Sequence, residues 1–141
     1  MFVRELMTTD MVTVPADISL REAIRRMLFK EVGYVVVVDE DGNPGGFITE
    51  TDVLHAVYQA EPPPSEISVV DVAHPPEFTV GPNTTIGHVA RKMIDRNERK
   101  VPVMDDLELV GVLTLSDIVA HLSDIRQDTA GNSRNEWGVN E

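Results

Sequence analysis

The chain contains the same sequence pattern twice, and this repetition limits its fold more than any other feature. The first half contains the run Gly46-Phe-Ile-Thr49-Glu-Thr51-Asp52, and the second half contains Gly111-Val-Leu-Thr114-Leu-Ser116-Asp117. Upstream, Val14 corresponds to Val80, and 80 − 14 gives an offset of 66 residues. A duplicated unit of this size usually packs against its twin about a pseudo-two-fold axis and forms clefts between the copies.

A stripe of apolar residues repeats at the same offset. Its members are Leu20, Ala23, Ile24, Met27 and Leu28, which return as Ile86, Val89, Ala90, Met93 and Ile94. This spacing predicts helices over 20–29 and 86–94, with Ser19 and Thr85 as their N-caps. The stripes are therefore expected to lie in the core.

Each repeat also contains a predicted hairpin and a second helix. The β-branched run Tyr34–Val38 predicts a buried strand that returns over 45–48, and 101–104 with 109–113 predicts the second hairpin. Pro102 inside that strand indicates an edge or a bulge. The second helices are expected from near Thr51 and over 116–122.

The predicted fold class is therefore α/β (α+β), with two tandem β-α-β-β-α repeats about a pseudo-two-fold axis and one shared core. We assign repeat 1 to residues 1–60, a Pro-rich linker to 61–66, repeat 2 to 67–125, and a polar, mobile tail with Trp137 to 126–141.

Composition narrows the classes of function. The net charge is −12, with 24 acids against 12 bases, and such a field repels nucleic acid and anionic membranes. The chain has no cysteine, and no apolar run approaches the ~20 residues that span a bilayer. We therefore expect a cytoplasmic protein, and the acid-rich, lysine-poor composition suits a halophilic source.

The residues also argue against catalysis and a dedicated metal site. The four histidines have no ligand spacing with one another or with acids, and no P-loop or nucleophile elbow is present. We expect no enzymatic activity and no required cofactor.

The repeated motif suits binding of a ribose and a phosphate. Gly46 and Gly111 would let the backbone approach a flat ligand closely. The hydroxyls of Thr49, Thr51, Thr114 and Ser116 would lie at helix starts, which favour anions. Asp52 and Asp117 would accept hydrogen bonds from a ribose diol. The alternative is that each Thr-x-x-Asp is a capping box, which needs no ligand.

The repeated β-α-β-β-α order and Gly-hydrophobic-x-Thr-x-Thr/Ser-Asp motif, over roughly residues 3–122, resemble the cystathionine-β-synthase (CBS) domain pair, or Bateman module. The resemblance implies a regulatory module that binds an adenosine-type ligand, such as AMP, ADP, ATP or S-adenosylmethionine, between the repeats. It also implies a homodimer that signals, for example in energy sensing, to a protein partner.

The resemblance further implies two composite sites. One would join Thr114, Ser116 and Asp117 to Gly33 and to the backbone of Asp10, Met11 and Val12. The other would join Thr49, Thr51 and Asp52 to the basic pair Arg99 and Lys100 and to the backbone of Pro76, Glu77 and Phe78. Alternatively, Arg99 and Lys100 are solvated turn residues, and the fold is a ligand-free scaffold that dimerises and docks on an enzyme or transporter.

Overall fold

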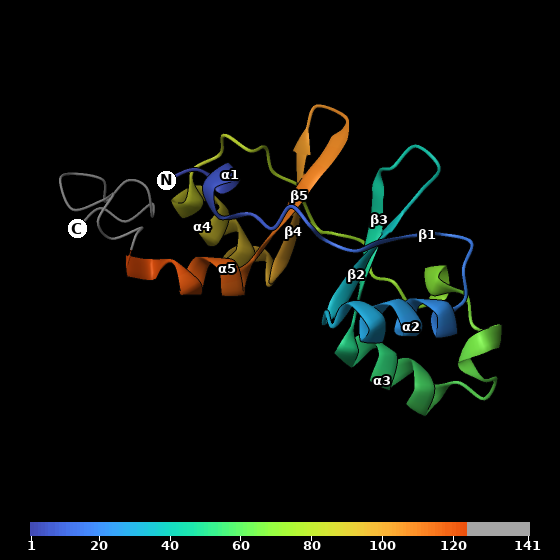
Figure 1. Ribbon diagram of the computed structural model, residues 1–141. Helices are drawn as coiled ribbons and strands as arrows, with labels where there is room; N and C mark the ends of the chain where they lie inside the picture. Colours follow the sequence, from blue (N-terminus) through green and yellow to red (C-terminus); the bar gives the residue numbers. More distant parts are fainter. Residues whose placement is uncertain (124–141) are drawn as a thin grey trace. The chain divides into compact units, whose positions relative to one another are not determined.

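The computed structural model describes residues 1–123, and they divide into two compact units (Figure 1). Unit 2 is residues 11–75, and unit 1 combines residues 1–10 with the chain from residue 76 onward. The N-terminal ten residues thus pack with the second repeat rather than the first, so the units differ from the repeat boundaries drawn from sequence. The predicted tail at 126–141, with Trp137, lies outside the described residues.

Unit 2 holds a three-stranded sheet of order β1-β2-β3 with two helices. Its elements are β1 (Thr13–Pro15), α2 (Leu20–Lys30), β2 (Tyr34–Val38), β3 (Pro44–Thr49) and α3 (Glu50–Gln59), followed by two 3-10 turns, η1 (Pro64–Glu66) and η2 (Val69–Asp71). β1 pairs with β2 in parallel, and β2 pairs with β3 as an antiparallel hairpin. Ser19 caps α2 as predicted, because its Oγ accepts the N–H of Glu22 at 3.2 Å.

Unit 1 repeats this plan with differences. Its elements are α1 (Val3–Leu6), α4 (Ile86–Arg96), β4 (Lys100–Asp105), β5 (Glu108–Thr114) and α5 (Leu115–Ala120). The short helix α1 was not predicted. Thr85 is the N-cap of α4 by position but makes no side-chain capping bond.

The first strand of unit 1 is reduced to a single bridge between Val80 and Val103. In unit 2 the N–H of Val36 donates to the carbonyl of Val12 at 2.9 Å and ties β1 to the sheet. The corresponding residue of β4 is Pro102, which has no N–H to donate to Phe78. Proline therefore shortens the ladder here. The register shift at Val103/Met104 of β4 has a counterpart at Val37/Val38 of β2, where there is no proline.

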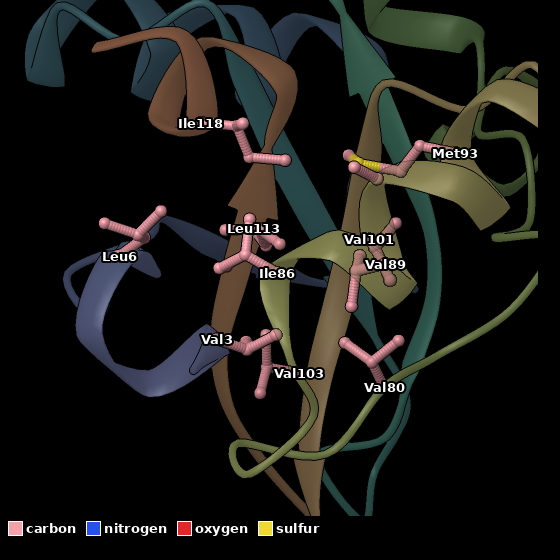
Figure 2. Close-up of a cluster of buried hydrophobic side chains, with 11 residues drawn as sticks. Val3, Leu6, Val80, Ile86, Val89, Met93, Val101, Val103, Leu113 and Ile118 are labelled. Atoms are coloured by element: carbon pink, nitrogen blue, oxygen red, sulfur yellow. The ribbon is translucent and has the colours of Figure 1, made fainter. Parts of the chain in front are cut away.

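Each unit has its own cluster of buried side chains. The unit 1 cluster gathers residues of α1, α4, α5, β4 and β5, and Figure 2 shows Val3, Leu6, Ile86 and Leu113 together. The unit 2 cluster contains Val14, Leu20, Ala23, Met27, Val35, Val37, Ile48 and Val69. Most of the predicted stripe positions are buried, but Ile24 is only partly buried, and Leu28 and Ile94 are 74% and 78% exposed, so these two do not lie in the core as expected.

The second helices bury less apolar surface than the first. Leu54 on α3 and Val119 on α5 remain 71% and 58% exposed, whereas Ile118 on α5 lies in the unit 1 core. Helices α3 and α5 begin directly after Thr49 and Thr114, so each Thr-x-x-Asp motif lies at the end of a hairpin.

Candidate ligand-binding site

The Thr49–Asp52 pair forms a complete capping box at the start of α3. The N–H and the hydroxyl of Thr49 donate to Oδ2 of Asp52 at 2.8 and 2.9 Å, and the N–H of Asp52 donates to Oγ1 of Thr49 at 3.2 Å. The capping alternative is therefore confirmed for this copy. A carboxylate has two oxygens, however, and none of these three hydrogen bonds involves Oδ1 of Asp52.

The second copy repeats this geometry. The N–H of Thr114 donates to Oδ2 of Asp117 at 3.0 Å, and the N–H of Asp117 donates to Oγ1 of Thr114 at 3.0 Å. Both acids are half-buried, which keeps them partly accessible to solvent. Each unit thus presents a fixed carboxylate at the same structural position.

The two motif glycines make room for the chain itself. A Cβ on Gly46 would lie 2.8 Å from the carbonyl oxygen of His74, and one on Gly111 would lie 2.9 Å from that of Thr8. The neighbouring residues are joined there by reciprocal backbone hydrogen bonds, Phe47 with His74 and Val112 with Thr8. The sequence suggested that a ligand would approach the backbone closely at these glycines. In this structure another segment of the same unit makes that approach: the chain at His74 in unit 2 and the chain at Thr8 in unit 1. We call these the crossing segments.

These crossing segments place two further side chains beside the carboxylates. His74 Nδ1 lies 3.1 Å from Oδ2 of Asp52, and Thr8 Oγ1 lies 3.4 Å from both carboxylate oxygens of Asp117. Sequence reasoning did not select His74 or Thr8. Their separation, 74 − 8, is 66, so the repeat offset contained the signal that they are equivalent.

A second backbone contact anchors the start of each motif helix. The N–H of Glu50 donates to the carbonyl of Gly33 at 3.2 Å, and the N–H of Leu115 donates to that of Arg99 at 2.8 Å. Lys100 is also the register partner of Thr114 in the β4–β5 hairpin. Within each unit, the motif therefore lies next to the residues that precede its own central strand.

The remaining predicted site residues are divided between the two units. The N–H of Glu77 donates to Oε2 of Glu98 at 2.9 Å, which holds the backbone between Pro76 and Phe78 beside the start of β4. Lys92 Nζ lies 4.7 Å from the ring centroid of Phe78. Asp10 lies two residues after Thr8 in unit 1, whereas Met11 and Val12 precede β1 in unit 2. Thr51 and Ser116 are exposed on the first turns of α3 and α5.

The described residues 1–123 contain no group of three or more histidines and acids that could hold a metal ion. No helix in this part of the chain is long and apolar enough to cross a membrane.

The fold therefore consists of two α/β units that each present the same capped carboxylate at the start of the second helix. The CBS domain family model matches residues 3–59 and 69–124, and the chain belongs to this family.

Relatives with solved structures share the fold over nearly their full length. The CBS domain protein PAE2072 of Pyrobaculum aerophilum, solved in complex with AMP, superposes with a TM-score of 0.76 at 28% identity, covering 90% of this chain and 99% of that one. The CBS domain pair of protein MJ0100, solved with 5′-methylthioadenosine and S-adenosyl-L-methionine, gives 0.76 at 26% identity, covering 89% and 98%.

Curated sequence relatives are longer proteins. The uncharacterized protein MK0525 of Methanopyrus kandleri is 30% identical over 118 residues, which is 83% of this chain and 60% of the relative. The chain spans 32% and 41% of two relatives from Methanocaldococcus jannaschii.

Proposed function

We propose that this chain is a non-enzymatic regulatory module that binds an adenosine-type ligand in clefts formed between its repeats and signals the ligand state to a partner protein. AMP, ADP, ATP and S-adenosylmethionine are the candidate ligands. The AMP complex of PAE2072 and the S-adenosylmethionine complex of MJ0100 support this class. We further propose that the module acts in the cytoplasm as a homodimer.

The observation that carries this proposal is the pair of fixed carboxylates, Asp52 and Asp117. Each is held through Oδ2 by the backbone N–H of its own N-cap. A carboxylate can accept about four hydrogen bonds, so capping does not exhaust it. A ribose diol, which donates two hydrogen bonds, is the part of an adenosine ligand that such a group recognises.

The proposed composite sites remain those that the family resemblance implies. Asp117 would act with Thr114, Ser116, Gly33 and the backbone of 10–12, and Asp52 with Thr49, Thr51, the backbone of 76–78, Arg99 and Lys100. A ligand with more negative charge should prefer the Asp52 site, because the basic pair would offset the overall charge of −12 there.

Calorimetric titration with adenosine, AMP, ATP and S-adenosylmethionine tests this function. Asp52→Asn should weaken one site, and Asp117→Asn the other, by about ten-fold or more, because an amide accepts ribose hydroxyls less strongly than a carboxylate. Asparagine retains an oxygen that can accept the N-cap N–H, so the helix starts should survive.

Asp39→Asn and Asp106→Asn are matched controls. Each removes the same charge from the same unit as the corresponding test variant, and both side chains lie on exposed hairpin turns. Asp106 has φ +55°, a conformation that asparagine tolerates. If the test variants bind like the parent, or if the parent binds no adenosine ligand below millimolar concentration, the ligand-sensing function is wrong.

A ligand-free scaffold is the second candidate. Leu28 and Leu54 in unit 2 are exposed, as are Ile94 and Val119 at the corresponding positions of unit 1. Exposed apolar side chains at equivalent positions favour a protein interface. This candidate takes precedence if the titrations detect no adenosine ligand while the chain still dimerises.

A further inference from the structure

A hollow of about 350 Å³ in unit 2 is lined by three cationic side chains. Its lining residues are Val12, Thr13, Arg25, Arg26, Phe29 and Lys30. No acidic residue is among them. The hollow lies where the C-terminal half of α2 faces the start of β1, and all of its residues belong to one unit.

This concentration of positive charge is unusual in the chain. Helix α2 carries four basic residues and one acid, a net charge of +3, within a protein of net charge −12. Lys30 in the last turn also stabilises the helix dipole. Arg25 and Arg26 lie a full turn earlier, where that role does not require them.

Glu22 holds both guanidinium groups. Its Oε1 accepts Nε of Arg25 at 2.9 Å, and its Oε2 accepts Nη2 of Arg25 at 2.7 Å and Nε of Arg26 at 3.0 Å. Only Nε of Arg26 is used, so both of its terminal nitrogens can donate elsewhere. These hydrogen bonds from Arg25 and Arg26 to Glu22, which we call the clamp, neutralise one positive charge and leave two net positive charges at the hollow. The clamp also restricts the arginine rotamers before any ligand binds.

Phe29 adds an apolar surface beside these charges, because its side chain is 78% exposed. Unit 1 has cations at the corresponding positions, Arg91, Lys92 and Arg96, but aspartate stands in place of Phe29 and histidine in place of Glu22. The clamp and the ring are therefore specific to unit 2.

We propose that this hollow is a binding site for a small polyphosphate anion, with Arg26 and Lys30 as its principal ligands and Arg25 in support. Arginine and lysine are the side chains that recognise phosphate oxygens, and two net positive charges match an anion of two or more negative charges. Val12 is also a proposed adenosine contact, but the inference rests on unit 2 alone and does not require the proposed function.

The test is titration of the full chain with inorganic tripolyphosphate, followed by calorimetry and by backbone amide chemical shifts. The parent should bind in a saturable manner, with the largest shifts at Val12, Thr13 and the last two turns of α2. Arg26→Gln with Lys30→Gln should weaken binding at least ten-fold. Arg26→Lys should weaken binding less than the double variant, because it keeps the positive charge although it loses the guanidinium donors.

Lys92→Gln with Arg96→Gln is the matched control, since it removes the same charge from the corresponding positions of α4. It should change tripolyphosphate affinity less than two-fold. Equal weakening by both double variants would mean that the anion responds only to overall charge, and this would overturn the proposal. So would a parent that does not saturate, or amide shifts that fall outside the hollow.

Adenosine carries no phosphate, so Arg26→Gln with Lys30→Gln should leave adenosine binding unchanged while it weakens tripolyphosphate binding. Failure of this site and failure of the adenosine site are therefore distinguishable. Thermal melts of each variant establish that it is folded. A change of oligomeric state in the Arg26/Lys30 variant, with unchanged anion binding, would identify the basic hollow as a contact between copies and would overturn the proposal.

Discussion

His74 in unit 2 and Thr8 in unit 1 occupy equivalent places, each directly beside the motif carboxylate. The distance from His74 Nδ1 to Asp52 Oδ2 is 3.1 Å, whereas Thr8 Oγ1 lies 3.4 Å from the carboxylate oxygens of Asp117. Both carboxylates cap their helices in the same way, so the two sites differ mainly in the neighbour that the crossing segment supplies.

Replacing either carboxylate with alanine should destabilise its unit through the loss of the capping box. Asp117→Ala should lower the free energy of unfolding by about 0.5–2 kcal/mol, the range for capping residues. Asp52→Ala should cost more than Asp117→Ala, because the contact that it removes with His74 is closer, at 3.1 Å, than the 3.4 Å contact of Thr8 with Asp117. Urea denaturation checks this order, and the reverse order would show that the His74 contact contributes nothing to stability.

A side chain at Gly46 should not be accommodated. Gly46→Ala would place Cβ 2.8 Å from the His74 carbonyl, a backbone atom that cannot rotate away, and we expect a loss of about 1–3 kcal/mol in stability. Gly45→Ala is the control, since its nearest neighbour is the Val37 carbonyl at an ordinary 3.6 Å. Thermal denaturation should show a lower midpoint for Gly46→Ala alone, and equal midpoints would contradict the packing described for this segment.

Glu22 should titrate at an unusually low pH. The hydrogen bonds from Arg25 and then Arg26 lower its pKa from 4.5 to about 2. Because the folded pKa lies below the unfolded value, the stabilisation is complete above pH 4.5 and disappears as the pH falls toward 2. Carboxyl NMR titration should give this midpoint, and Arg25→Ala should move it upward. A midpoint near 4.5 in the parent would mean that the clamp is absent in solution.

The exposed apolar residues of the second helices should control self-association. If the chain dimerises through them, Leu54→Glu or Val119→Glu should shift the protein toward monomer at tens of micromolar, because a charge cannot be buried unpaired at an interface. Gln59→Glu places the same charge on an exposed position of α3 and should have no effect. Light scattering that finds the parent monomeric at these concentrations would argue against a dimer.

Local pattern was sufficient to predict most helices and strands. Helix α2 and strand β2 follow from periodicity and β-branched residues that lie close together in the sequence. The same reasoning failed for the first strand of the second β-α-β-β-α repeat, which the structure reduces to Val80. Its pairing depends on Pro102, more than twenty residues away, whose missing N–H reduces the ladder to one bridge.

The helix ends show the limit of sequence reasoning about burial. Ile118 and Val119 are adjacent apolar residues, and the sequence alone does not distinguish which of the two is buried. Ile118 is 3% exposed and Val119 is 58% exposed, because the direction in which α5 leaves the hairpin sets which side chain meets the core of unit 1.

By itself, the sequence determined that the protein is a duplicated α/β module with a Thr-x-x-Asp motif at the start of each second helix, because capping and periodicity are local interactions. Only the tertiary structure decided what lies against those motifs. The contact of Thr8 with Asp117 joins residues 109 positions apart, and its partner is set by the path of the chain rather than by neighbouring residues. For the same reason, the N-terminal ten residues complete the second repeat instead of the first.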